Sequence, residues 1–343
     1  MYLRKRALAG TLVLVMVLST SLISLSGSGA KVTYEYYVEG NAADVETSTS
    51  PALLLAGGSN DIAEAMLWMI EKSGGGDFVI IRATGTDAYN PWIYKQLGGV
   101  DSCETIIFLE PESCYDPFLI GQVRNAEALF IAGGDQWDYV SMWKDTPVED
   151  AIHYVLDKGA PIGGTSAGLA VLGEFVFTAE NDTVESDDAL KNPYDRRDCL
   201  ENDFLVMPNM EDKITDSHFV ARDRMGRLVT FLARIVKDGW APMARGIGID
   251  EKTALGVVPN GDVTIFGLCN DGTAAAYFLQ TPGYGPEVCE PKTPLTYTGI
   301  SVYKMTLSTT FNLVTWTGTG GTWYHLSAVD GTLVSDQPDG SIY

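Results

Sequence analysis

The sequence predicts an α/β protein built on a mostly parallel, doubly wound sheet with helices on both faces, followed by a β-rich C-terminal part. Short apolar runs alternate with amphipathic segments between residues 51 and 172, and several of these runs end in paired glycines. From about residue 246, closely spaced short strands replace the helical pattern. Alternation of buried strands with helices is typical of parallel sheets, whose sites form beyond the carboxyl ends of the strands.

The N-terminal half supplies strands and helices in turn. Predicted strands are the apolar runs at 51–56, 78–81, 105–109, 128–132 and 161–164. Predicted helices, with apolar residues at helical spacing, are 62–72, 117–124 and 148–158. Asp61 is expected to cap the first of them. The glycine-rich loops after three of the strands therefore face one edge of the sheet, where we expect the chemistry.

The second half contains one more long helix and then strands. The helix is expected to start at Arg222 and to run to Ile235. Later strands are expected at 247–250, 254–258, 263–266, 274–279, 300–307 and 310–315. The predicted organisation is a signal peptide over 1–30, a linker or edge strand over 31–50, an α/β domain over 51–290 and a β-rich extension over 291–343.

The first thirty residues have the three parts of a secretory signal peptide. Three basic residues at 4–6 precede an apolar stretch that is densest at 12–18, and a small-residue run leads to a cleavage site after Ala30. The stretch is short for a retained membrane anchor and is interrupted by Ser and Thr. The sequence therefore predicts a secreted or extracytoplasmic protein that has no membrane contact after cleavage.

Charge and cysteine content exclude other classes. With 45 acidic and 23 basic residues the net charge is −22, which repels phosphate backbones and anionic membranes and argues against nucleic-acid binding. Disulfides closing short loops, Cys103–Cys114 and Cys269–Cys289, are expected in an exported chain, with Cys199 left over. No cysteine pair has CxxC spacing and the chain has three histidines, so no metal site is expected.

The sharpest chemical signal is the pentapeptide Gly164-Thr-Ser-Ala-Gly168. It follows a predicted strand and opens a predicted helix, which is the setting of a nucleophile elbow. Such a turn exposes the hydroxyl of Ser166 at a helix N-terminus, where backbone N–H groups stabilise an oxyanion. The alternative is a glycine-rich tight turn with a capping serine.

A serine nucleophile needs a base and a third group that orients the base. His218 is favoured over His153, which lies in a predicted amphipathic helix, because it stands beside an aspartate and an arginine cluster. That cluster is Arg222, Arg224 and Arg227. Its arginines either bind a carboxylate or form a solvated helix face. For the third group the sequence offers Asp250 or Glu251, which point to opposite sides of a strand end.

Three separated motifs, in order, resemble the cyanophycinase branch of the peptidase E serine peptidases. They are 163–168, 216–219 with the arginines that follow, and 246–254, within a similarity that extends from about Pro51 to Phe266. The resemblance implies a flavodoxin-like or class I glutamine-amidotransferase-like core. It also implies Ser166 as nucleophile and His218 as general base, favours Glu251 as the orienting acid, and places oxyanion donors at Gly134 and Ala167.

The resemblance further implies a peptide substrate, with cyanophycin cleaved to β-Asp-Arg dipeptides. Implied substrate-binding residues are Gln136, Asp216, Ser217, Arg222, Arg224 and Arg227. No cofactor or metal is needed for this chemistry, and homodimers are common in that family. We also expect the acidic insertion 180–203, through Asp187, Asp188 and Asp195, to hold the arginine arms of the substrate.

Three alternatives stay open on the sequence. One is an aspartyl dipeptidase of the peptidase E type. Another is an α/β-hydrolase esterase, whose order of catalytic residues would make His325 the base. The third is an inactive protein that keeps the fold to bind peptides.

Overall fold

Five short parallel strands form the centre of a ten-stranded sheet in the computed structural model, which describes residues 31–267 and 274–343. In pairing order they are β4 (Ser102–Phe108), β3 (Asp77–Arg82), β5 (Ala128–Ile131), β6 (Ile162–Thr165) and β2 (Leu53–Ala56). Every residue of β2, β4, β5 and β6 is buried. Strands of this kind are stable only when both faces of the sheet are covered.

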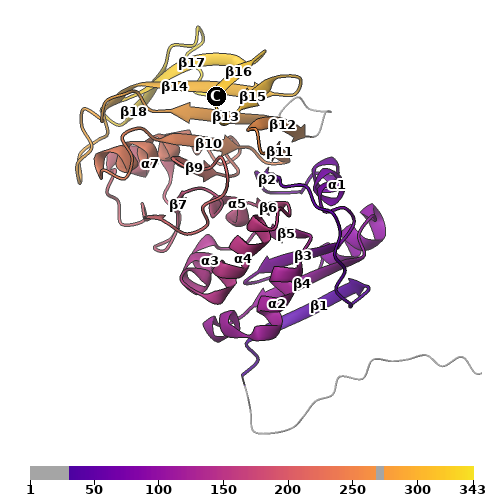
Figure 1. Ribbon diagram of the computed structural model, residues 1–343. Coiled ribbons are helices and arrows are strands. Elements are labelled where there is room, and N and C mark those ends of the chain that lie inside the picture. The colour runs from indigo at the N-terminus through magenta and orange to yellow at the C-terminus, as the bar shows by residue number, and fades with distance from the viewer. Residues whose placement is uncertain (1–30, 268–273) are drawn as a thin grey trace, which may run out of the picture. The chain divides into compact units, whose positions relative to one another are not determined.

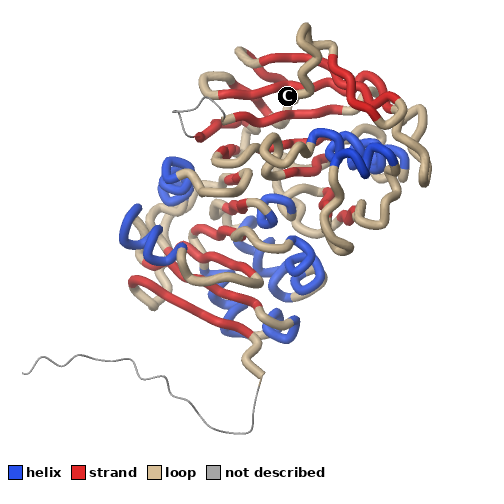
Figure 2. Tube along the Cα trace, turned by 180° about the vertical axis from the view of Figure 1, so that it is seen from behind, coloured by secondary structure: helices blue, strands red, loops and turns tan. Residues whose placement is uncertain are grey.

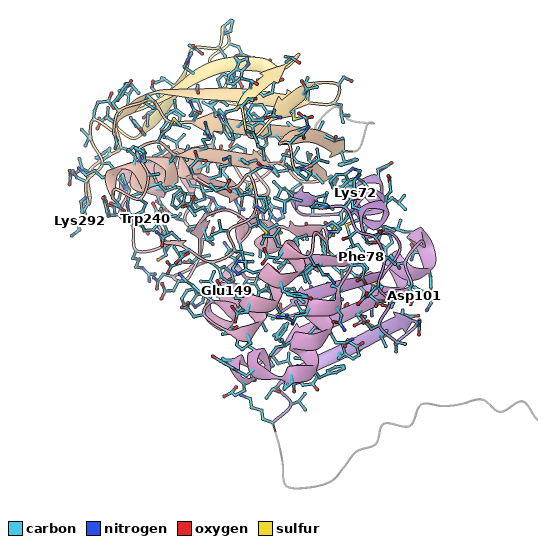
Figure 3. The ribbon with its side chains drawn as sticks, in the orientation of Figure 1. Lys72, Phe78, Asp101, Glu149, Trp240 and Lys292 are labelled. Atoms are coloured by element: carbon cyan, nitrogen blue, oxygen red, sulfur yellow. The ribbon has the colours of Figure 1, made fainter. Side chains whose placement is uncertain are left out.

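Helices cover both faces of these strands, as Figure 2 shows. One face packs against η2 (Pro111–Tyr115), α2 (Pro117–Asn125), α3 (Gln136–Trp143) and α4 (Pro147–Asp157). The other packs against α1 (Ala63–Lys72), whose last residue is labelled in Figure 3, and η1 (Pro91–Leu97). The predicted cap of α1 is wrong, because Ile62 occupies the cap position and Asp61 instead accepts a hydrogen bond from Tyr89.

Antiparallel strands extend this sheet at both ends. At one edge β1 (Tyr34–Gly40) pairs with β4. Beyond β2 the order continues with β11 (Thr253–Val257), β12 (Asp262–Gly267), β15 (Thr310–Asn312) and β16 (Thr317–Thr319).

A second sheet of eight strands lies in the part of Figure 1 coloured from pink to yellow, which also contains β11, β12, β15 and β16 of the first sheet. Its order is β18 (Thr332–Ser335), β17 (Thr322–Val329), β14 (Tyr297–Thr306), β13 (Ala275–Gln280), β10 (Arg245–Ile249), β9 (Lys213–Asp216), β7 (Phe175–Phe177) and β8 (Leu200–Asn202). The pairs β7·β9 and β9·β10 are parallel and the others antiparallel. Helices α6 (Ser186–Lys191) and α7 (Met225–Lys237) share a core with it.

The predicted α/β class with parallel strands is confirmed, but the arrangement differs from one doubly wound sheet. Counted from β2, the parallel strands lie in the order 3-2-4-5-1, whereas a flavodoxin-like sheet has 2-1-3-4-5. The later strands divide between the two sheets, with some extending the first and the others building the second. Apolar runs predict which residues form a buried strand, but the partner of each strand is decided by contacts far apart in the sequence.

Residues after 291 contribute to both sheets. Strands β15 and β16 extend the first sheet, while β14, β17 and β18 extend the second. The Tyr343 hydroxyl donates a hydrogen bond to Asp223 (2.8 Å) and accepts one from the Met225 amide (3.1 Å). The Tyr343 ring also packs edge-on against Phe219. The C-terminal strands and Tyr343 therefore support the segment 219–225; the predicted domain boundaries themselves stay predictions.

The predicted Cys103–Cys114 disulfide is wrong. Both thiols are free and buried, and they lie in cores on opposite faces of the ten-stranded sheet. Two cysteines separated by a sheet cannot approach to disulfide distance. Cys289 is buried, and its predicted partner Cys269 lies outside the described residues, so that pairing stays a prediction.

The predicted signal peptide over 1–30 lies outside the described residues as well. Within residues 31–267 and 274–343, none of the helices has the length and apolar character needed to cross a bilayer.

Candidate active site

Ser166 stands in a sharp turn between β6 and α5 (Ala167–Ala170), with φ 54° and ψ −113°. A left-handed backbone is costly for a non-glycine residue, so the surroundings must enforce it. Glycines on either side allow the close packing that does so. A Cβ on Gly164 would lie 2.4 Å from the Gly168 carbonyl oxygen, and one on Gly168 would lie 2.0 Å from that of Ile131. The pentapeptide therefore forms the turn that the sequence predicts.

Ser166 lies at one end of a chain of three hydrogen-bonded side chains. Its Oγ is 2.8 Å from Nε2 of His218, and Nδ1 of His218 is 2.6 Å from Oε1 of Glu251. His218 and Glu251 follow β9 and β10, which are parallel neighbours, so both strands end at the same edge. In the neutral imidazole with a proton on Nδ1, Nε2 accepts the serine proton.

Burial favours the uncharged form of the His218 imidazole, which can accept a proton. Burial lowers the pKa of His218, the hydrogen bond to Glu251 partly opposes this, and the charges of Arg222 and Arg224 lower it further. The hydrogen bond from His218 lowers the pKa of Glu251 below its ordinary range. At neutral pH the imidazole is therefore uncharged and ready to take a proton, beside an ionised carboxylate.

Asp250 lies on the other side of the strand end. Its Oδ1 accepts hydrogen bonds from the amides of Val220 (3.1 Å) and Ala221 (3.0 Å). The structure therefore brings Glu251 to the imidazole, whereas Asp250 holds the turn that follows His218.

The arginine cluster divides into two kinds of residue. Arg227 is buried and uses its donors within the protein, on Asp216 and on Thr183. Arg224 donates to the Ser217 carbonyl (2.9 Å) and more weakly to Asp216 (3.3 Å). With the single negative charge of Asp216 these two guanidinium groups leave a net positive charge at the base of the pocket.

Arg222 and Arg224 line the pocket together with Arg227 but are less engaged by other side chains. Arg222 is exposed at the rim. Burial lowers the pKa of Arg224 to about 10, with Asp216 opposing the shift, so this guanidinium stays charged at neutral pH. The helix predicted to start at Arg222 begins at Met225, because Asp223 is left-handed (φ 48°) and the Arg224 amide bonds back to Phe219.

These groups surround a cavity of about 220 Å³. Its lining includes Ser166, His218 and the other predicted residues Gly134, Gln136, Ala167, Asp216, Ser217, Arg222, Arg224 and Arg227. Gln136 donates to the Phe177 carbonyl (3.2 Å). Phe177, Asp182 and Thr183 also line it, and sequence reasoning missed them. Position at the start of the acidic insertion was the signal that could have found Asp182 and Thr183.

The acids predicted to hold arginine arms are used elsewhere. Asp187 pairs with Lys191 (3.3 Å), while Asp188 and Asp195 pair with Arg197 (3.0 and 2.8 Å). None of these three acids lines the cavity. The prediction that these three acids hold the substrate in the cavity is therefore wrong, because each of them pairs with a base of the same segment.

The other two histidines lie apart from this site. His325, on β17, contacts Asp336 (3.0 Å) and its side chain is 62% exposed. His153 lies within α4. Among the described residues there is no group of His, Cys, Asp and Glu able to hold a metal ion.

The elbow serine, the histidine and the glutamate define a serine-type hydrolase site on an α/β fold. Residues 105–260 match the sequence profile of Peptidase family S51. The cyanophycinase of Trichormus variabilis is 29% identical over 182 residues, 50% of this chain and 55% of that protein. The cyanophycinase of Geminocystis herdmanii is 31% identical over 164 residues, 45% and 53% respectively. The chain thus spans about half the length of the curated relatives it matches.

A solved peptidase from an acI-B1 Actinobacterium shares the fold. It has a TM-score of 0.51 and 18% identity, and the match covers 77% of this chain and 98% of that one. Residues 105–260 are thus similar to Peptidase family S51 and the chain is similar to curated cyanophycinases, in agreement with the family that its three motifs resemble.

Proposed function

We propose that the protein hydrolyses peptides at aspartyl linkages through an acyl-enzyme. His218 takes the Ser166 proton as Oγ attacks the carbonyl carbon, and Glu251 stabilises the imidazolium. Backbone N–H groups of Gly134 and Ala167 stabilise the oxyanion. The imidazolium then protonates the leaving amine, and a water molecule, deprotonated by His218, releases the acid and regenerates Ser166. The hydrogen-bonded chain of 2.8 and 2.6 Å carries this proposal.

The charge of the cavity supports an acidic residue on the acyl side. Arg224 is charged and faces the cavity, with Arg222 at the rim. A guanidinium group binds a carboxylate strongly and with defined geometry, which suits an aspartyl side chain or α-carboxylate beside the scissile bond. Gln136 supplies a neutral polar group to the same cavity. Arg227, whose donors are occupied, acts by holding Asp216 in place.

Cyanophycin is the proposed substrate, and β-Asp-Arg the proposed product. Two curated relatives carry the name cyanophycinase. The cavity also contains Asp135 and Asp182, acids suited to a cationic arm beside the aspartyl backbone. The three-part sequence of residues 1–30 supports action outside the cytoplasm, so we propose a secreted enzyme.

The test uses purified residues 31–343 with cyanophycin and with a panel of aspartyl dipeptides. We expect release of β-Asp-Arg from cyanophycin, measured by chromatography, and loss of release in Ser166→Ala. Cleavage of dipeptides alone would replace the proposed substrate by an N-terminal aspartyl peptide. No turnover of either substrate by a folded protein would contradict the proposed activity.

A further inference from the structure

Ala56 at the end of β2 and the two glycines that follow it contact all three segments that carry the proposed catalytic side chains, and the mechanism above gives them no role. Three consecutive carbonyls, those of residues 56–58, accept hydrogen bonds from the amides of Ser166 (3.1 Å), His218 (2.7 Å) and Lys252 (3.0 Å). Lys252 directly follows Glu251. We call residues 56–58 the β2 exit segment.

Each of these three donors lies in a left-handed turn. The φ angles are 54° for Ser166, 47° for His218 and 55° for Lys252. A non-glycine residue in this region costs on the order of 1–3 kcal/mol and persists only where the surroundings fix it. One short segment thus bonds to the strained residue of each catalytic turn. It sets the spacing among three turns that come from two different sheets.

Gly58 also contacts the imidazole itself. Its φ is +97°, and a Cβ built there would lie 2.6 Å from both Cε1 and Nε2 of His218. The backbone has little freedom to retreat, because the carbonyls of Gly57 and Gly58 are both bonded. A side chain at Gly58 would therefore displace the ring from Ser166. At Gly57 a Cβ would lie 2.0 Å from the Asp250 carbonyl oxygen.

The chain just after the segment is held by Asp61. Tyr89 donates a hydrogen bond to Asp61 Oδ2 (2.5 Å). The other oxygen of Asp61 is buried and makes no hydrogen bond, and the same is true of the hydroxyl of Thr165, which precedes Ser166. Asp61 thus ties the loop after β2 to the segment that carries Tyr89.

We propose that the β2 exit segment is a positioning element, which sets the distance between Ser166 and His218, with Gly58 required beside the imidazole. This inference rests on the proposed function, because it assigns a role within the same site. It concerns the rate of the chemical step and not the binding of substrate, since no residue of the segment lines the cavity.

The main test compares Gly58→Ala with Gly239→Ala. Gly239 has φ +80°, and no atom lies within 4 Å of a Cβ built on it. It follows α7 and adjoins Trp240, labelled in Figure 3. The two variants share the backbone penalty, but Gly58→Ala alone adds atoms beside His218. We expect kcat about 100-fold lower for Gly58→Ala with KM unchanged, and parent kcat and KM for Gly239→Ala.

A second readout needs no substrate. The proton between His218 and Glu251 is expected to give a low-field NMR resonance, which Gly58→Ala shifts or abolishes and Gly239→Ala leaves unchanged. A parent protein that cleaves no tested peptide but shows this difference would sink the proposed substrate and retain the positioning role. Parent kcat and an unchanged resonance in folded Gly58→Ala would overturn the inference.

Asp61→Ala covers the case in which Gly58→Ala does not fold. It removes the hydrogen bond between Tyr89 and Asp61 that holds the loop after β2, and it adds no atoms near the ring. We expect kcat about 10-fold lower with KM unchanged, and a broadened resonance. Parent values of kcat and an unchanged resonance in this variant would then overturn the inference.

Discussion

Ser166 and His218 are 2.8 Å apart, yet their segments are held in different ways. The elbow around Ser166 is fixed by close backbone packing, with Gly168 against the carbonyl of Ile131. The turn after His218 is fixed largely by charged side chains. Asp216 pairs with Arg227, and Asp250 accepts two amide hydrogen bonds.

Because of this difference, the two segments should respond differently to substitutions that change volume and to substitutions that change charge. Steric packing of backbone depends on volume alone, so the elbow should tolerate changes of charge and fail when an atom is added. A turn held by buried ion pairs tolerates small changes of volume, but it fails when one charge loses its partner. Substitutions on the two sides of the site should therefore fail for different reasons.

The largest effect is expected from Gly168→Ala on the packed side. The new Cβ would lie 2.0 Å from the Ile131 carbonyl oxygen, and backbone on both sides of the contact cannot move aside. We expect a loss of about 5 kcal/mol or more in the free energy of unfolding, measured by denaturant titration. Gly121→Ala is the control, because nothing lies within 4 Å of its Cβ in α2. That variant should gain about 0.5–1 kcal/mol.

A smaller loss is expected from Arg227→Met on the charged side. It leaves the buried carboxylate of Asp216 with the Ser217 amide and the weaker contact to Arg224 as its remaining partners, so we expect about 3–5 kcal/mol of destabilisation. Adding Asp216→Asn removes the unpaired charge and should recover part of this loss. If the losses in the free energy of unfolding caused by Arg227→Met and by Asp216→Asn simply add in the double variant, the ion pair between these residues does not hold the turn.

The smallest effect is expected from Arg222→Gln and is seen in the pH profile. The positive charge of Arg222 lowers the His218 pKa, so its removal raises that pKa. The acid limb of kcat/KM should move to higher pH by about 0.5 unit at low salt, and by less at high salt. Arg124→Gln is the control, since Arg124 packs on Tyr154 at the opposite edge of the sheet. If the acid limb of kcat/KM does not move in Arg222→Gln, the charge of Arg222 does not affect the pKa of His218.

The local parts of the site were open to prediction from the sequence. A serine flanked by glycines after an apolar strand predicts a sharp turn, and all of the evidence for it lies within five consecutive residues. The scarcity of histidine narrowed the base to His218, and the strand before Glu251 placed two acids at one strand end. These inferences use spacing and chemistry within short segments, which is the information that a single sequence carries.

The long-range parts were not predictable in the same way. Nothing in the residues 56–58 shows that their carbonyls bond to amides more than a hundred positions later. The division of roles between Arg224 and Arg227 also depends on burial, which follows from the packing of α7. The prediction for the acidic insertion was wrong because Asp187, Asp188 and Asp195 pair with bases of the same segment, Lys191 and Arg197.

The docking of Tyr343 on the segment after His218 has a consequence for the order in which the site is completed. Ribosomes deliver the chain from its N-terminus, so the elbow and its parallel strands emerge well before β14 and Tyr343. Strand β10, which precedes Glu251, pairs with β13, and β13 pairs with β14; both of these strands are synthesised after it. A growing chain therefore contains Ser166 well before the segment after His218 gains the contacts of Tyr343.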